Sequence, residues 1–342
     1  MKLFLEDGTL TAGESFGAPI DAAGEVVFNT GMTGYVESFT DPSYAGQIVV
    51  LTYPLIGNYG VPDPSAWESA KVHIAGLIVS EYSAQYSHFD AQRSLSEWLK
   101  AAGVPAISGV DTRALTKRLR EHGIMLGQLS HSGKKGAFVD PNADNLVAKV
   151  SVKAPSLHGS GPKKIIAIDC GMKENIMRSL VRPETTVVRV PWDHDFTRDA
   201  YDALFISNGP GDPTRCVATI EHIRQAMTAG KPILGICLGN QLLSLAAGGK
   251  TYKLKYGHRG QNQPALEKGT DRCFITSQNH GFAVDPKKLS KEWDEWFVNG
   301  NDGSNEGVRH KTKPWRSVQF HPEACPGPTD TAWIFDEFIE TI

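Results

Sequence analysis

The sequence has no positive charge excess, no long apolar run and no signal for export. Its 342 residues carry a formal net charge of -3. Proteins that bind nucleic acid through its phosphates usually carry a basic excess, so we expect no nucleic-acid partner. No run approaches the roughly 20 apolar residues of a membrane helix. The opening segment MKLFLEDGTL contains neither an apolar signal core nor an arginine-rich transit pattern. We therefore expect neither a membrane partner nor a targeting segment.

Cysteines are few, and their spacing shows no paired motif. The chain has 5 cysteines, widely spaced and without a C-x-x-C pair: Cys170, Cys216, Cys237, Cys273 and Cys325. This spacing favours neither a disulfide framework nor a zinc site, so we predict no metal and a reducing, cytoplasmic location. With 40% hydrophobic and 21% charged residues the composition is globular, and the length predicts two domains.

The two halves of the chain differ in pattern. Residues 1–151 contain short apolar runs broken by glycine and proline, which predicts a mixed sheet with few helices. Helices are expected after Ser94 or Ser96 and after Asp111, ending at Gly103 and Gly123, because these residue types cap helix ends. Residues 152–164 are dense in proline, glycine, serine and lysine and are expected to form an interdomain linker.

Residues 165–342 begin with alternating strand and helix patterns. KIIAID, TTVVRVPW, ALFIS and KPILGIC read as strands, separated by helical stretches such as ENIMRSLV and CVATIEHIRQAM. This alternation predicts an α/β domain whose mostly parallel central sheet is flanked by helices. Ligands bind such sheets at the carboxyl ends of the strands.

One cysteine lies at such a strand end. Gly235-Ile-Cys-Leu-Gly239 has the form G-x-C-x-G between a predicted strand and a predicted helix, which is a nucleophile elbow with cysteine in place of serine. The sulfur of Cys237 is expected to stand clear of the sheet, at a helix N-terminus that favours the thiolate. Most cysteines only fill space, and we assign that role to Cys170, Cys216 and Cys273.

A candidate base follows near the C-terminus. In the segment SVQFHPEACPGP, His321 and Glu323 are two residues apart, and Pro322 favours an extended backbone at His321. In an extended chain they point to the same side, so Glu323 can hold one ring nitrogen and leave the other for the thiol. The pair alone is a weak signal, and the elbow in the same half of the chain strengthens it.

The chemistry also needs hydrogen-bond donors for an oxyanion. The backbone N–H of Leu238 follows the nucleophile directly. The loop SNGPGDP follows another strand, and Gly209 and Gly211 permit close approach of its backbone. Without the elbow this loop would be read as a plain turn.

Together GICLGNQ, SNGPGDP and HPE resemble the class I, or triad-type, glutamine amidotransferases. The resemblance implies that Cys237 attacks the side-chain amide of glutamine, that His321 is the base and acid, and that Glu323 orients it. It also implies release of ammonia and a glutamyl thioester that water hydrolyses.

The first half resembles the small, glutamine-hydrolysing subunit of carbamoyl-phosphate synthetase, through segments such as GEVVFNTGMTGYVESFTDPSYAG and GVDTRALTKRLREHG. This implies a mixed β/α N-terminal domain before the amidotransferase domain, and a large synthetase subunit or fused synthetase domain as partner. ATP, Mg²⁺ and bicarbonate are expected only on that partner, with no cofactor in this chain. The glutamine contacts carried over from the family are Ser43, Gly209, Gly211, Leu238, Gln241, Asn279, Gly281 and Phe282.

One residue departs from the family pattern, because Asn240 stands where G-H-Q is frequent. Asn240 lies outside the proposed triad, so we expect the chemistry to survive, and we assign His280 a structural role. Other functions stay open. They are a free-standing cysteine hydrolase or protease, a regulatory subunit with a vestigial site, and an amidotransferase that serves another synthetase.

Overall fold

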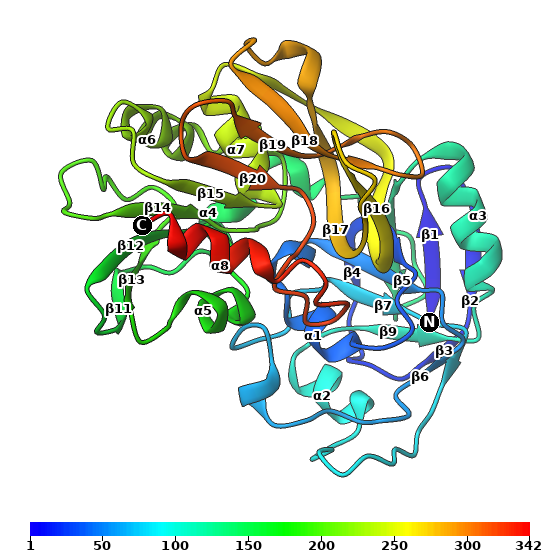
Figure 1. Cartoon of the computed structure of the whole chain (residues 1–342). Coiled ribbons are helices and arrows are strands. Elements are labelled where there is room, and N and C mark those ends of the chain that lie inside the picture. Colours follow the sequence, from blue (N-terminus) through cyan, green and yellow to red (C-terminus); the bar gives the residue numbers. More distant parts are fainter. The chain divides into compact units, whose positions relative to one another are not determined.

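The computed structural model describes all 342 residues, which fold as two units, Met1–Ala143 and Asp144–Ile342 (Figure 1). The division falls before the expected linker at 152–164. Helix α4 (Leu146–Val150) belongs to the second unit, and strand β11 (Ser156–Gly159), inside the expected linker, pairs antiparallel with β13 (Thr185–Pro191). The linker expectation missed β11 because an edge strand with three of its four residues exposed has no apolar pattern to reveal it.

The first unit is built on a mixed sheet, in keeping with its sequence pattern. The strand order is β2-β1-β10-β4-β5-β7-β9-β3, in which β4, β5, β7 and β9 run parallel and the outer strands antiparallel. The strands are β1 (Lys2–Leu5), β2 (Leu10–Ala12), β3 (Glu14–Ser15), β4 (Ala22–Asn29), β5 (Gln47–Leu51), β7 (Gly76–Ile78), β9 (Ala106–Ser108) and β10 (Met125–Ser130), and a separate parallel pair is formed by β6 (Leu55–Ile56) and β8 (Glu81–Tyr82).

The first unit contains three helices, α1 (Tyr35–Thr40), α2 (Leu95–Ala101) and α3 (Thr112–His122). Of these, α2 and α3 begin and end where the capping residues predicted, and α1 was not predicted. Ser94 and Glu97 form a capping box at the start of α2, and Asp111 accepts from the N–H of Ala114 at 2.8 Å at the start of α3. Gly103 and Gly123 follow with φ of 69° and 98°, a conformation that costs glycine little.

The second unit contains a ten-stranded sheet in the order β11-β13-β12-β14-β15-β20-β19-β18-β16-β17. The predicted parallel centre is present: β13, β12 (Lys163–Asp169), β14 (Ala203–Ile206), β15 (Ile233–Ile236) and β20 (Trp315–Val318) all run parallel. The sheet then continues in an antiparallel extension of β19 (Asn305–His310), β18 (Trp293–Asn299), β16 (Lys250–Glu267) and β17 (Cys273–Asp285). The sheet is thus parallel only in its central part.

Alternate residues of the parallel strands face two separate cores. Ile166 and Ile168 of β12 pack on the face covered by α6 (Val217–Met227) and α7 (Leu238–Ala246). Ile165 and Ala167 pack on the other face, against α5 (Glu174–Leu180) and α8 (Trp333–Glu340). Both faces are buried, which explains why these strands read as continuous apolar runs. Each large apolar side chain buried in this way stabilises the fold by roughly 1.5–3 kcal/mol.

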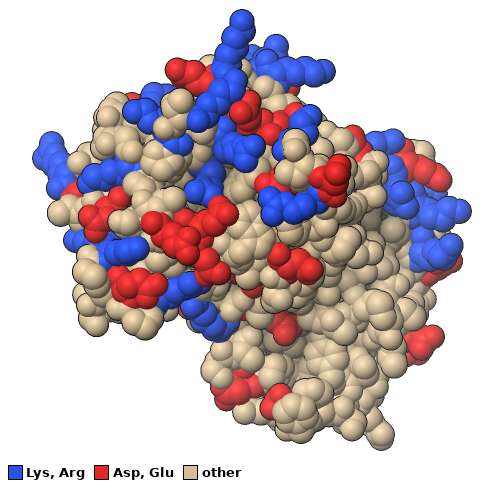
Figure 2. Space-filling model, viewed as in Figure 1, with Lys and Arg blue, Asp and Glu red and all other residues tan.

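The remaining short helices are 3₁₀ turns: η1 (Pro42–Tyr44), η2 (Pro64–Ala66), η3 (Pro141–Ala143), η4 (Pro213–Arg215) and η5 (Pro286–Lys288). On the face drawn in Figure 2, basic and acidic side chains are interspersed rather than gathered by sign. No helix of the chain has both the length and the apolar character needed to cross a bilayer.

Candidate active site

Cys237 occupies a strained turn between β15 and α7. Its φ of 54° and ψ of -103° lie outside the conformations that L-residues favour. The flanking glycines make the turn possible. A Cβ on Gly235 would lie 2.5 Å from the carbonyl oxygen of Gly239, and a Cβ on Gly239 would lie 2.2 Å from that of Ile206. The segment therefore has the strand–turn–helix geometry that G-x-C-x-G predicts.

The sulfur, however, does not stand clear of the sheet. Cys237 is only 2% exposed, and its Sγ donates to the carbonyl oxygen of Asn279 on β17 at 3.6 Å. The expectation of an open sulfur was wrong because the antiparallel extension, which the sequence pattern did not predict, brings β17 over the turn. A substrate must therefore displace part of this cover to reach the thiol.

The sheet itself brings the nucleophile and the candidate base to one edge. β15 and β20 are parallel neighbours, with Ile236 opposite Val318, and the N–H of Cys237 donates to the carbonyl oxygen of Val318 at 2.8 Å. His321 follows β20 by three residues. Its own N–H donates to the carbonyl oxygen of Ser277 on β17 at 2.9 Å. These two backbone hydrogen bonds thus fix the main-chain positions from which the thiol and the imidazole extend.

His321 and Glu323 form the expected pair. Nδ1 of His321 lies 2.6 Å from Oε1 of Glu323, and both side chains are buried. Nε2 of His321 makes no hydrogen bond of regular geometry, yet the Cys237 thiol is among the groups that raise the pKa of this imidazole. Nε2 of His321 is therefore left for proton transfer.

A buried lysine, which the sequence patterns did not single out, completes this group. Nζ of Lys173 lies 3.1 Å from Oε1 of Glu323 and also donates to the carbonyl oxygen of Ala324. Lys173 is 3% exposed and stands just before α5, far from Glu323 along the chain. The lysine of the GMKEN segment matches no short motif for a catalytic group. Only the sign of the charge needed beside a buried carboxylate could have suggested a basic partner.

Charges within the group set its protonation. Burial disfavours charge on His321, but the charges of Glu323 and Cys237 outweigh it and raise the pKa of His321 to about 10. Burial likewise raises the pKa of Glu323, and the charges of Lys173 and His321 more than reverse this, lowering it to about 2. At neutral pH Glu323 is ionised, so it can stabilise a proton held by His321.

The predicted oxyanion loop lies against the elbow. A Cβ on Gly209 would fall 2.1 Å from the carbonyl oxygen of Cys170 and 2.9 Å from Cδ2 of Leu238, so only glycine fits there. Gly211 has a φ of 86°, which also favours glycine. Leu238 is the first residue of α7, and the first N–H groups of a helix have no partner within it. These features suit close approach of a substrate oxygen.

Gln241 and Asn240 are both buried on α7 but lie in different surroundings. Nε2 of Gln241 donates to the carbonyl oxygen of Phe282 at 2.9 Å and to Oε1 of Gln319 at 3.0 Å. Asn240 accepts from Oγ of Ser317 at 2.8 Å and donates to Gln319 at 3.3 Å. Asn240 therefore takes part in packing between α7 and β20, which supports its place outside the triad.

The other predicted glutamine contacts lie in two places. Asn279, Gly281 and Phe282 lie on β17, whose Asn279 and Phe282 carbonyls contact Cys237 and Gln241. Ser43 belongs to the first unit, where it is buried in η1 and its N–H donates to Asp41 at 2.9 Å. Its part in glutamine binding stays a prediction.

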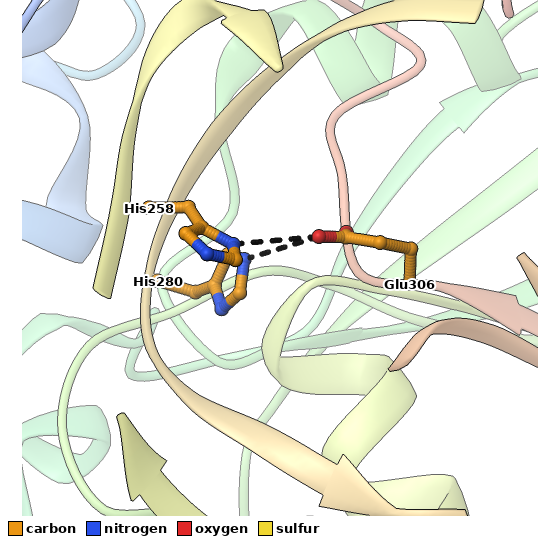
Figure 3. Close-up of side chains that lie close together, drawn as sticks. All are labelled: His258, His280 and Glu306. Atoms are coloured by element: carbon orange, nitrogen blue, oxygen red, sulfur yellow. Dashed lines mark ion pairs between the residues drawn. The ribbon is translucent and has the colours of Figure 1, made fainter. Parts of the chain in front are cut away.

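A second buried group of titratable side chains lies beside β17. His258 and His280 both point toward Glu306, with His258 Nδ1 at 3.4 Å and His280 Nε2 at 4.0 Å from Oε1 (Figure 3). Two imidazoles and a carboxylate are a metal-ligand set. Here, though, Asn299 Nδ2 also donates to Glu306 Oε1 at 2.8 Å, and Asp302 holds Nε2 of His258 at 3.0 Å.

The charges of the side chains in this second group compensate one another. Burial opposes protonation of His258, but Asp302 and Glu306 raise its pKa to about 9, while burial and the charge of His258 hold the pKa of His280 far below its usual range. A protonated His258 thus supplies the positive charge between two carboxylates. His280 donates from Nδ1 to the carbonyl oxygen of Phe282 at 2.8 Å, and its structural role stays a prediction.

Comparison with known proteins identifies the class. The family model "Glutamine amidotransferase class-I" matches residues 166–341, so the chain belongs to the class I glutamine amidotransferase family. The first unit narrows the choice among the class I amidotransferases. The model "Carbamoyl-phosphate synthase small chain, CPSase domain" matches residues 3–129, so the chain combines the two domains of a carbamoyl-phosphate synthase small chain.

Several relatives match along nearly the whole chain, and the following three are examples. It is 53% identical to Multifunctional protein CAD of Squalus acanthias, covering 99% of this chain and 16% of that protein. It is 49% identical to Multifunctional protein URA2 of Saccharomyces cerevisiae, covering 100% of this chain and 17% of that protein. It is 49% identical to Carbamoyl-phosphate synthase [ammonia], mitochondrial, of Aquarana catesbeiana, covering 100% and 24% respectively. The chain thus spans a quarter or less of these relatives' lengths.

Proposed function

We propose that this chain hydrolyses glutamine to glutamate and ammonia with Cys237, His321 and Glu323, and that the ammonia serves carbamoyl phosphate synthesis. The observation that carries the proposal is the strained backbone of Cys237, at φ 54°, beside a histidine held by a carboxylate at 2.6 Å. Strain of this kind persists only where the surrounding structure maintains it, and it is concentrated at functional sites.

In the first half of the reaction, the proton of the Cys237 thiol passes to Nε2 of His321, and the sulfur attacks the side-chain amide carbon of glutamine and forms a C–S bond. The carbonyl oxygen becomes an oxyanion, which the N–H of Leu238 and the backbone near Gly209 can stabilise. One such donor is worth about 2.7–4 kcal/mol in the transition state. His321 then gives its proton to the amide nitrogen as the C–N bond breaks, and ammonia leaves.

In the second half, water transfers a proton to His321 and attacks the thioester carbon. The C–S bond breaks as His321 returns its proton to the sulfur, which restores the Cys237 thiol and releases glutamate. Glu323 keeps its negative charge throughout. It holds the Nδ1 proton and favours the protonated imidazole that forms in each half of the reaction.

The substrate would be recognised by the segments that surround the elbow. Gln241 uses both hydrogens of its amide on Phe282 and Gln319, so its Oε1 is left as a hydrogen-bond acceptor. An acceptor suits the α-ammonium group of glutamine. Asn279, Gly281, Phe282 and Ser43 are the further contacts that we propose, with Gly209 and Gly211 along the side chain.

We further propose that a synthetase chain or fused synthetase domain receives the ammonia and binds ATP, Mg²⁺ and bicarbonate, with no cofactor held by this chain. The CPSase small-chain match in residues 3–129 supports this partner. A cytoplasmic location stays a prediction, in line with the 5 cysteines, all of which are free.

The test is the Cys237→Ser variant, assayed with its synthetase partner for glutamine-dependent and ammonia-dependent carbamoyl phosphate synthesis. We expect glutamine hydrolysis to fall by about 10³-fold or more, because the oxygen of serine is a poor replacement for the thiolate. Ammonia-dependent synthesis should stay unchanged. If the Cys237→Ser variant hydrolysed glutamine at nearly the wild-type rate, Cys237 could not be the nucleophile.

A further inference from the structure

Gln319 lies at the junction between the strand that leads to the base and the helix that follows the nucleophile. It comes directly after β20 and two residues before His321, and it is fully buried. Its backbone N–H donates to the carbonyl oxygen of Glu306 at 2.8 Å, which fixes its main chain. Its side chain reaches α7, where it meets Asn240 and Gln241.

One backbone carbonyl oxygen determines the orientation of three buried side-chain amides, those of Gln241, Gln319 and Asn240. The Phe282 oxygen can only accept, so the Gln241 atom 2.9 Å away must be Nε2. The same Nε2 lies 3.0 Å from Gln319, whose facing atom must therefore be the acceptor Oε1.

The orientation of the Gln319 amide in turn fixes that of the Asn240 amide. The Asn240 atom 3.3 Å from Gln319 Oε1 must be the donor Nδ2. Its Oδ1 is then left to accept from Oγ of Ser317, which lies 2.8 Å away. Gln319 Oε1 thus accepts from both neighbouring amides of α7.

This arrangement has a cost that packing does not explain. Nε2 of Gln319 is buried without a hydrogen-bond partner, which destabilises a fold by roughly 1–3 kcal/mol. An apolar side chain of similar size would avoid that penalty and still fill the space. What it could not do is accept from Gln241. The amide is therefore accounted for by its oxygen and not by its volume.

We propose that Gln319 is a positioning residue for glutamine binding. Its Oε1 takes the second hydrogen of Gln241 Nε2, which prevents the Gln241 amide from rotating and keeps Gln241 Oε1 directed at the ammonium group of the substrate. The proposal rests on the proposed function, since it assigns how one of the glutamine contacts is held.

The test compares Gln319→Met, which keeps the size but removes the acceptor, with Gln319→Glu, which keeps an acceptor in the same place. In the 342-residue chain with its synthetase partner, we expect the Met variant to raise the KM for glutamine at least about tenfold, the effect of weakening one hydrogen bond to a charged group. The kcat should change much less, and the Glu variant should restore KM toward the wild-type value. Gln225→Met, on the exposed face of α6, is the matched control and should leave KM unchanged.

A double variant separates positioning from general disturbance. In a Gln241→Ala background, Gln319→Met should raise KM no further, because the amide that it orients is gone. An unchanged KM in a folded Met variant, or an equal rise in the Met and Glu variants, would overturn the proposal. If Gln319→Met does not fold, Gln319→Asn, which withdraws the oxygen by one carbon, must raise KM in its place. Failure of the wild-type chain to hydrolyse glutamine would instead refute the proposed function.

Discussion

At the scale of single residues, the site depends on a row of alternating charges in a buried place. Lys173 neutralises Glu323, and Glu323 in turn favours a proton on His321. Breaking a buried ion pair by removing one partner costs roughly 3–5 kcal/mol, because the other charge is left uncompensated. The lysine therefore acts on the base through the carboxylate, from which its Nζ lies 3.1 Å away.

Lys173→Met should move the acid limit of the enzyme to higher pH. The pKa of Glu323, about 2, lies below its ordinary value of 4.5, so the stability and orientation that it provides are present above pH 4.5 and are lost as pH falls through about 2. Without the lysine charge this loss should begin at a higher pH. The measurement is the pH profile of kcat/KM for glutamine, together with thermal unfolding at each pH.

Lys173→Arg keeps the charge and should retain most of the wild-type profile. Lys163→Met is the control, because Nζ of Lys163 donates to the carbonyl oxygen of Ile339 at 2.7 Å and not to Glu323. This variant should leave the acid limit of the kcat/KM profile unchanged. If a folded Lys173→Met variant kept the wild-type acid limit of its kcat/KM profile, the role given to Lys173 would be contradicted.

At the scale of elements, the turn between β15 and α7 stores strain at the nucleophile. The positive φ of Cys237 is held by the parallel pairing of β15 with β20 on one side and by the glycine contact beneath α7 on the other. Such a conformation costs of order 1–3 kcal/mol for a residue other than glycine.

Two truncations of Cys237 separate strain from lost packing. Cys237→Ala keeps the strain and Cys237→Gly relieves it, so the Gly variant should be more stable than the Ala variant by about 1–3 kcal/mol. Urea unfolding of both variants provides the comparison, and both should be inactive. A Gly variant less stable than the Ala variant would show that the turn is not strained.

The sequence allowed these elements to be predicted where local rules govern them. The capped helices α2 and α3, the parallel strands and the elbow all follow from patterns a few residues long. The antiparallel extension did not. β16 is 18 residues long, with register shifts and exposed stretches, so its apolar alternation is irregular. The burial of Cys237 and the partner of Glu323 depend on contacts far apart in the chain, which no local pattern encodes.

At the scale of the whole molecule, the chain corresponds to a small part of its relatives. The identities of 53% and 49% extend over 99% and 100% of the chain, yet it covers only 16% and 17% of the two multifunctional proteins. A site whose thiol is 2% exposed needs an opening motion to admit glutamine. A partner that favours the open state would control the rate of hydrolysis.

We therefore expect the isolated chain to hydrolyse glutamine slowly and to gain at least about tenfold in kcat/KM, or about 1.4 kcal/mol, when its synthetase partner is added. Steady-state glutamate release with and without the partner measures this. Cys237→Ser plus partner serves as the control for hydrolysis by the partner itself. Equal rates would show that the site is not coupled to a partner.

The central claim is that Cys237 becomes covalently joined to the substrate. Acid quenching of the wild-type chain during turnover of glutamine, followed by proteolysis and mass spectrometry, tests it directly. We predict a γ-glutamyl group on the peptide that contains Cys237, present during turnover, lost after glutamine is exhausted, and absent in Cys237→Ser. Sustained release of glutamate without any such adduct, or with the adduct on another residue, would contradict the account.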